Sequence, residues 1–238
     1  MSWILIAIGN FVFQFRGSPV RVLHTTEWIA WESIIQHLTS GDFPNQPEPP
    51  SRLLVLNKIP GQKLDNLLNQ SSHAHGLKLC GIATQSLYQF HQHPVKLTGN
   101  EKTLLSHGDA SVHNVLIDEE NLSATWFDFD LRHNLDKPEN WRHADDLRAL
   151  LFTTACYFRT EQLDELIRVI RLNYQSEEVW SSLRQQIGSF WFDFDVFHAA
   201  QIRRCRSSDT SRPPSDISYR RINSSVRDLL LRSQRPLI

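Results

Sequence analysis

A polar run near the middle of the chain has the residue types that phosphoryl transfer requires. Residues 107–114 read HGDASVHN, and WFD follows at 126–128. Transfer from a nucleotide needs a carboxylate beside the acceptor hydroxyl and hard oxygen ligands for magnesium. We therefore expect Asp109 to act as the base, and the amide oxygen of Asn114 and the carboxylate of Asp128 to bind the metal.

The segment between these residues predicts a hairpin that positions them. Residues 115–118 and 124–127 are strand-like, and Glu119-Glu120-Asn121 lies between them as a turn. Val115 would begin a strand that holds Asn114 rigidly. The returning strand would then present Asp128 beside it.

The runs HGDASVHN, WFDFD and HADDLRALL together resemble the aminoglycoside phosphotransferase and choline kinase group of the protein-kinase-like superfamily. The resemblance extends from about Leu104 to Leu151. It implies that Asp109 is the catalytic base, that Asn114 and Asp128 bind magnesium, and that His107 shapes the loop. It also implies that Asp146 braces the loop backbone from below.

Outside this region the resemblance is fainter but implies a nucleotide site. The stretch VLNKIPG at 55–61 is similar to the segment that joins two lobes and receives adenine, which implies cofactor contacts at Leu56, Lys58 and Ile59. The implied cofactors are ATP and Mg²⁺. The implied partner is a small-molecule phosphate acceptor with a hydroxyl or amine.

One position departs from the family pattern. The strand that should end in a phosphate-binding Lys offers His24 or Arg21, with Glu32, or less favourably Glu27, as the acidic partner. Histidine is largely neutral at pH 7 and binds phosphate more weakly than a permanent cation. A catalytically weak or inactive kinase-like (pseudokinase) binding protein is therefore an alternative.

A metal-dependent phosphoesterase is a second alternative. Six residues have suitable ligand types for two metals: His107, Asp109, His113, Asp128, His143 and Asp145. The usual GDxH and GNHD elements of such enzymes are absent from the sequence. A second WFDFD copy at 191–195 has no HGDxxxxN run before it, so we interpret it as a core aromatic cluster with surface carboxylates.

Composition narrows the class of protein. The 238 residues include 25 Lys and Arg against 26 Asp and Glu, so no global field attracts nucleic acid. No apolar run approaches the roughly twenty residues of a membrane span. The three cysteines are far apart in the sequence and favour a reducing cytoplasm.

The order of elements predicts an α+β fold with two kinase-like lobes. A small β-rich lobe would cover residues 1–59, with strands at 3–8, 11–15, 20–23 and 52–59 and a helix from Glu27. A mainly helical lobe would cover 60–238, ending in a basic tail. Its expected helices are 64–68, 79–90, 144–158, 163–174, 179–191 and a last one from Ser224, with strands at 103–106, 115–118 and 124–127.

Overall fold

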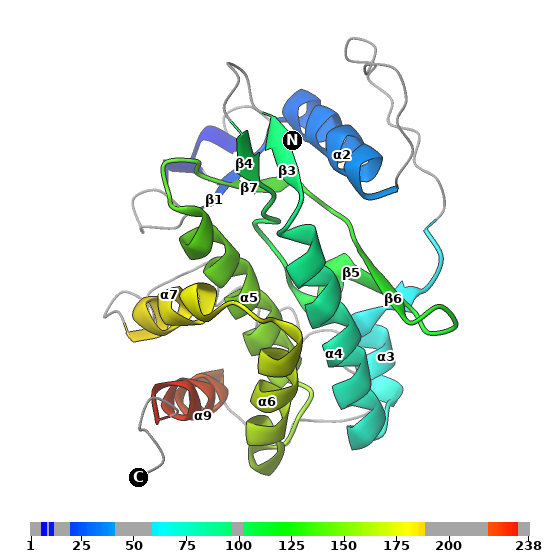
Figure 1. The fold of residues 1–238 in the computed structure, drawn as a ribbon, viewed down its shortest axis with the longest axis vertical. Helices are drawn as coiled ribbons and strands as arrows, with labels where there is room; N and C mark the ends of the chain where they lie inside the picture. Colours follow the sequence, from blue (N-terminus) through cyan, green and yellow to red (C-terminus); the bar gives the residue numbers. More distant parts are fainter. Residues whose placement is uncertain are drawn as a thin grey trace.

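Helices form most of the described structure and small antiparallel sheets lie against them, so the predicted α+β class is confirmed (Figure 1). The computed structural model describes residues 6–8, 10–11, 20–40, 59–96, 102–188 and 219–232. The α-helices are α2 (Thr25–Ser40), α3 (Leu64–Gln70), α4 (His73–Phe90), α5 (Glu139–Ala155), α6 (Leu163–Asn173), α7 (Glu177–Gly188) and α9 (Tyr219–Arg232). The strands are β1 (Val20–Val22), β2 (Gln62–Lys63), β3 (Pro94–Lys96), β4 (Lys102–Leu104), β5 (Val115–Asp118), β6 (Ser123–Trp126) and β7 (Leu131–His133), and 3-10 turns are η1 (Val112–Asn114) and η2 (Thr160–Gln162).

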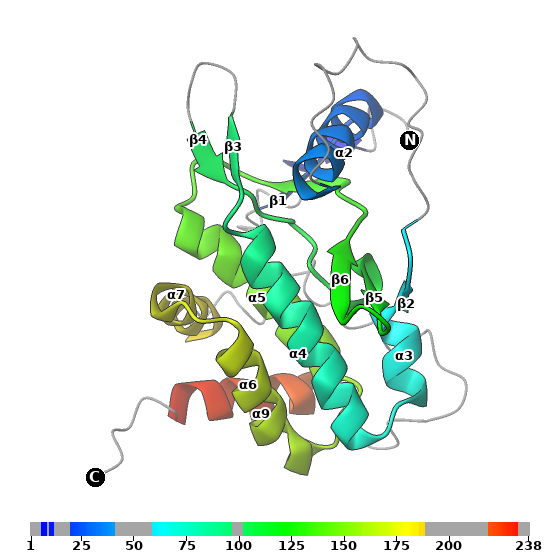
Figure 2. The same ribbon diagram turned by 45° about the vertical axis from the view of Figure 1, so that its right-hand side comes forward.

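The helical body is built on amphipathic patterns. In α4 the side chains of Leu79, Ala83 and Leu87 recur at four-residue intervals and are all buried. Burying each leucine contributes about 1.5–3 kcal/mol. The helix begins where the Ser72 hydroxyl accepts a hydrogen bond from the backbone N–H of His75. Helix α4 packs against α6, α5 packs against α7, and α9 contacts α5, α6 and α7 (Figure 2).

The β5–β6 hairpin follows the predicted register closely. Val115 pairs with Trp126, and Asp118 pairs with Ser123 at the turn. The Asp118 carboxylate accepts hydrogen bonds from the backbone N–H groups of Glu120 and Asn121, which closes the turn. This hairpin returns the chain to the end of the 107–114 loop, so that the residue before Asp128 lies beside Asn114.

Three further ladders complete the sheets of the described residues, and one of them pairs β3 antiparallel with β4. Strand β2 pairs with the free edge of β5, and β1 pairs antiparallel with β7. Gly61, before β2, has φ +107°, and a Cβ there would lie 2.4 Å from the carbonyl oxygen of Ile117. Only glycine fits this approach. The β1–β7 ladder joins the segment before α2 to the segment after Asp128.

Helix α5 is buried along most of its length, and this includes polar side chains. Every residue from Arg142 to Ala155 is buried. Charged groups in such a position need partners, because burying an unpaired charge is costly. The partners of Asp145, Asp146 and Arg148 define the candidate site below.

The predicted strand at 3–8 is wrong where the structure describes it, since residues 6–8 are helical, as are 10–11 of the strand predicted at 11–15. A short continuous apolar run does not distinguish a strand from a helix by periodicity. The predicted strand at 103–106 ends earlier, at Leu104, and the helix expected from Glu27 begins at Thr25. Residues 52–58 and 189–218 lie outside the described residues. No helix in the described part of the chain is long and apolar enough to cross a membrane.

Candidate active site

The backbone of the 107–114 loop is held by one buried carboxylate on α5. The backbone N–H groups of His107 and Gly108 donate to Asp146 Oδ2 and Oδ1 at 2.7 and 2.8 Å. Asp146 is 1% exposed. The expectation that Asp146 braces the loop is therefore confirmed. Gly108 has φ +91°, and a Cβ there would lie 2.9 Å from the carbonyl oxygen of Leu131, so the loop passes against β7 only because this residue is glycine.

His107 connects the loop to the strand that precedes Asp128. Its Nδ1 accepts a hydrogen bond from the backbone N–H of Asp109 at 3.3 Å, so the proton of the neutral ring lies on Nε2. Nε2 donates to the carbonyl oxygen of Phe127 at 3.0 Å. Burial lowers the pKa of His107 to about 4, although the Asp146 carboxylate acts in the opposite direction. His107 therefore stays neutral near pH 7 and shapes the loop, as the family resemblance implied.

Asn114 lies beside the chain at Asp128. Its carbonyl oxygen accepts from the backbone N–H of Phe127 at 3.1 Å, and its side-chain Nδ2 donates to the Asp109 carbonyl oxygen at 2.9 Å. The second bond orients the amide and presents Oδ1 away from that contact. Asp128 has φ +66°, a left-handed conformation that costs free energy for a residue other than glycine and is concentrated at functional sites.

The loop also contains a buried hydroxyl without a partner. Ser111, two residues after Asp109, is 0% exposed, and its Oγ makes no hydrogen bond to the described residues. An unsatisfied buried polar group costs about 1–3 kcal/mol. Asp109 itself is 4% exposed and Asn114 is 3% exposed. The 107–114 loop thus combines strict backbone positioning with an unsatisfied polar group.

Glu32 lies against the same segment from the side of α2. Its Oε2 accepts from the backbone N–H of Phe129 at 3.0 Å, and the side chain is 2% exposed. Burial, and to a smaller extent the Asp128 carboxylate, raises the pKa of Glu32 against the lowering effect of its hydrogen bonds. Glu32 thus holds the residue that follows Asp128.

The cations predicted for β1 are arranged differently from the sequence expectation. Arg21 pairs with Glu27, the less favoured acidic partner, at 3.6 Å between Nη1 and Oε2. The backbone N–H of His24 donates to the same Glu27 oxygen at 3.2 Å. Ile59 is half-buried just before β2. Leu56 and Lys58 lie outside the described residues.

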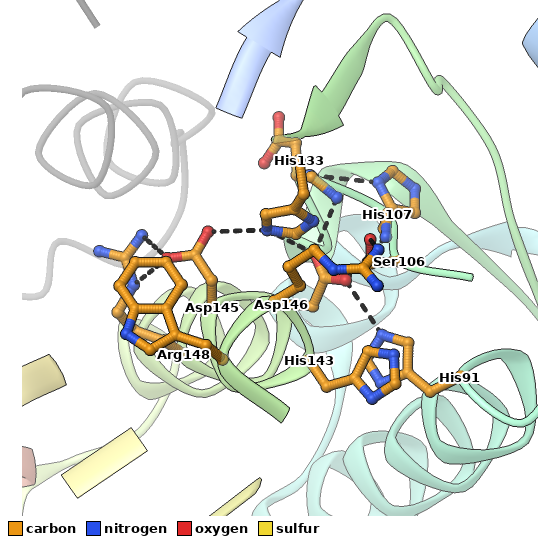
Figure 3. Close-up of polar contacts among 12 residues, drawn as sticks. His91, Ser106, His107, His133, His143, Asp145, Asp146 and Arg148 are labelled. Atoms are coloured by element: carbon orange, nitrogen blue, oxygen red, sulfur yellow. Dashed lines mark hydrogen bonds and ion pairs between the residues drawn. The ribbon is translucent and has the colours of Figure 1, made fainter. Parts of the chain in front are cut away.

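A buried cluster of imidazoles surrounds Asp146 (Figure 3). His91 donates from Nε2 to Asp146 Oδ2 at 3.0 Å and accepts from the Tyr174 hydroxyl at Nδ1, 2.6 Å away. The His143 ring stacks on His91 with centroids 4.0 Å apart, and its Nε2 bonds to the Leu105 carbonyl oxygen. Burial is the main cause that lowers the pKa of both rings, to about 3 for His143. The brace is therefore held by neutral histidines.

On its other side, Asp146 adjoins a buried ion pair. His133 Nε2 lies 3.2 Å from Asp145 Oδ2 and 4.0 Å from Asp146 Oδ1, and Arg148 Nη2 lies 2.8 Å from Asp145 Oδ1 (Figure 3). Burial raises the pKa of Asp145, but Arg148 and His133 outweigh it and hold that pKa below its usual range. Sequence reasoning missed these supporting roles of His91, His133, Asp145, Arg148 and Tyr174. The only local signal was the number of polar residues on an otherwise apolar helix pattern in α5.

The histidines of the phosphoesterase hypothesis are engaged elsewhere. His113 Nδ1 pairs with Asp65 Oδ2 at 2.8 Å, and His143 bonds to a backbone carbonyl. Within the described ranges no group of three or more His, Cys, Asp and Glu side chains is arranged to hold a metal ion. One carboxylate and one amide oxygen still suit Mg²⁺, which takes most of its ligands from phosphates and water.

Comparisons of the chain with protein-family models, curated proteins and solved structures found no match. The assignment of a function therefore depends on the geometry of the 107–114 loop and its neighbours.

Proposed function

We propose that this chain is an ATP- and Mg²⁺-dependent phosphotransferase of two-lobed, protein-kinase-like fold, acting on a hydroxyl or amine of a small molecule. The observation that supports it best is the fixed loop. Asp146 binds two successive N–H groups before Asp109, and Asn114 bonds to both the Asp109 carbonyl and the Phe127 N–H. Such positioning accounts for much of phosphoryl-transfer catalysis.

In this proposal each residue of the loop has one role. Asp109 accepts the proton of the acceptor's hydroxyl group while the hydroxyl oxygen bonds to the γ-phosphorus. The bond from that phosphorus to the bridging oxygen breaks, and ADP leaves. Asn114 Oδ1 and Asp128 would hold the magnesium ion, which, when bound, neutralises charge on the phosphates. The left-handed backbone of Asp128 and the Glu32 contact to Phe129 fix the carboxylate's direction.

A kinase-like protein with little or no turnover is the second candidate. The observation that favours it is the engagement of Glu32 with the Phe129 backbone N–H, because a phosphate-binding cation would need such a carboxylate as its partner. Arg21 is instead paired with Glu27. Such a protein would still bind nucleotide through the Asn114 and Asp128 oxygens.

Nucleotide binding is tested first by thermal unfolding. We expect ATP with Mg²⁺ to raise the melting temperature, because a ligand that binds only the folded state stabilises it. Asp128→Ala should abolish this gain, whereas Asp164→Ala, which removes an exposed carboxylate on α6, should retain it. The absence of a shift with any nucleotide would refute both kinase-like readings.

Turnover then separates the two candidates. ATP hydrolysis and phosphorylation of a panel of small alcohols and amines would be measured for the wild type and Asp109→Asn. We expect the variant to lose about 10²–10⁴-fold in kcat with little change in KM, since a general base acts in the transition state. Binding without any turnover would favour the inactive candidate, and equal rates would remove Asp109 from the mechanism.

A further inference from the structure

Two arginines face each other across the short β1–β7 ladder. Arg21 and Arg132 are direct cross-strand partners. Side chains at such positions lie on the same face of the sheet, with Cβ atoms about 4.5–5.5 Å apart, and like charges there repel. The neighbouring partners Val20 and His133 are buried on the opposite face, where His133 meets Asp145. The arginines therefore point away from the Asp146 brace and toward α2, which Figure 1 shows beside this ladder.

Arg132 has an unused hydrogen-bonding capacity. Its guanidinium lies over the Trp31 ring, 4.4 Å from the centroid, and is only half-buried. Among the described residues it makes no hydrogen bond and no ion pair. A cation–π contact of this kind is an attraction between the charge and the ring, and it does not require the N–H donors as hydrogen-bond partners. The side chain is thus fixed in direction while its donors are free for a ligand.

Among the described residues, two arginines and one glutamate act on the charge of Arg132. Burial first, and then Arg21 and Arg142, lower the pKa of Arg132, while Glu27 acts in the opposite direction. Glu27 is already shared between Arg21 and the backbone N–H of His24. Arg142 is engaged by Thr103, Ser106 and the Leu104 carbonyl oxygen. Within the described residues, Glu27 is thus the carboxylate shared by two facing guanidinium groups, which leaves their positive charge incompletely neutralised.

We propose that Arg21 and Arg132 form a binding site for a phosphate-type oxyanion, separate from the Asn114 and Asp128 oxygens. Forked guanidinium donors match the oxygens of a phosphomonoester, and one anion between two strands would relieve their mutual repulsion. The anion would also join β1 to β7. It could belong to a free small molecule or to a phosphorylated protein side chain. The site does not depend on phosphoryl transfer by this chain.

Calorimetric titration with inorganic phosphate at constant ionic strength tests the site. We expect binding to the wild type, and a loss of about tenfold or more in affinity for both Arg132→Gln and Arg21→Gln, because each removes a charged donor. Arg159→Gln, which removes an exposed arginine at η2, should bind like the wild type. Two independent variants guard against one that misfolds. No binding, or equal affinity in all three variants and the wild type, would overturn the site.

Two further arms separate this site from the nucleotide site and identify the source of the anion. Phosphate should still bind to Asp128→Ala and to protein saturated with ATP and Mg²⁺. The proposal would be overturned if phosphate binding were lost in Asp128→Ala but retained in Arg132→Gln. A phosphoserine peptide and phenyl phosphate are then compared. The probe that binds more tightly than inorganic phosphate, with the same loss in Arg132→Gln, identifies the source.

Discussion

Acidification is expected to destabilise this fold through the buried imidazoles around Asp146. His91, His107 and His143 are all at most 5% exposed, and burial lowers their pKa values in each case. In the unfolded chain the pKa of each histidine returns to about 6.5. A group whose folded pKa is depressed stabilises the fold above its unfolded pKa, and that stability is lost as the pH falls toward the folded pKa. The window runs from 6.5 to about 4 for His107 and to about 3 for His143.

The size of the effect follows from linkage. Lowering the pH from about 7 to about 5 costs about 2 kcal/mol for each imidazole that stays neutral in the folded state, or about 4 kcal/mol for His107 and His143 together. His91 adds to this loss in the same direction. Glu32, whose pKa is raised, binds its proton more readily in the folded state and offsets part of it. The loss is a large fraction of the free energy of unfolding of a typical domain, which is roughly 5–15 kcal/mol.

Urea unfolding followed by tryptophan fluorescence at several pH values measures this slope. His143→Gln keeps a donor for the Leu105 carbonyl but cannot protonate. It should lower the dependence of the unfolding free energy on pH by about 1 kcal/mol per unit near pH 5.5. His93→Gln, which removes a half-buried imidazole outside the cluster, is the matched control. Identical slopes for the two variants would refute the assignment of His143 as a buried neutral group.

Three substitutions test the brace by the same unfolding assay. Gly108→Ala should cost about 2–3 kcal/mol, because it adds a Cβ 2.9 Å from the Leu131 carbonyl oxygen at φ +91°; a neutral result would contradict that backbone conformation. Asp146→Asn should cost about 2–4 kcal/mol, since an amide has one acceptor oxygen and cannot accept at both positions from the N–H groups of His107 and Gly108. Wild-type stability of this variant would argue against the two bonds. Tyr174→Phe should cost about 1–2 kcal/mol by leaving Nδ1 of His91 without a donor, whereas a similar loss in Tyr88→Phe would show that the hydroxyl contact is not the cause.

Local spacing was enough to predict the hairpin, whereas the Asp146 brace was implied by the family resemblance and joins residues 38 and 39 positions apart. The strands at 115–118 and 124–127 are close in sequence, and their register follows from the turn at 119–122. The stretch at 6–8 was misassigned because an apolar run of that length suits both strand and helix. Contacts across long separations left no local pattern. His91 and Asp146 are 55 residues apart, and the Arg21–Arg132 pairing depends on a ladder of three residues.

The hydrogen bond between His107 and Phe127 makes the ring proton of this histidine a built-in spectroscopic reporter. The proton on Nε2 is enclosed by the protein and should exchange slowly with water, so its nuclear magnetic resonance signal should be observable at neutral pH. Phe127 is the residue directly before Asp128. A ligand that binds Asp128 and moves its backbone should therefore shift this signal. The corresponding proton of His143 bonds to the Leu105 carbonyl oxygen and offers an internal reference in the same spectrum.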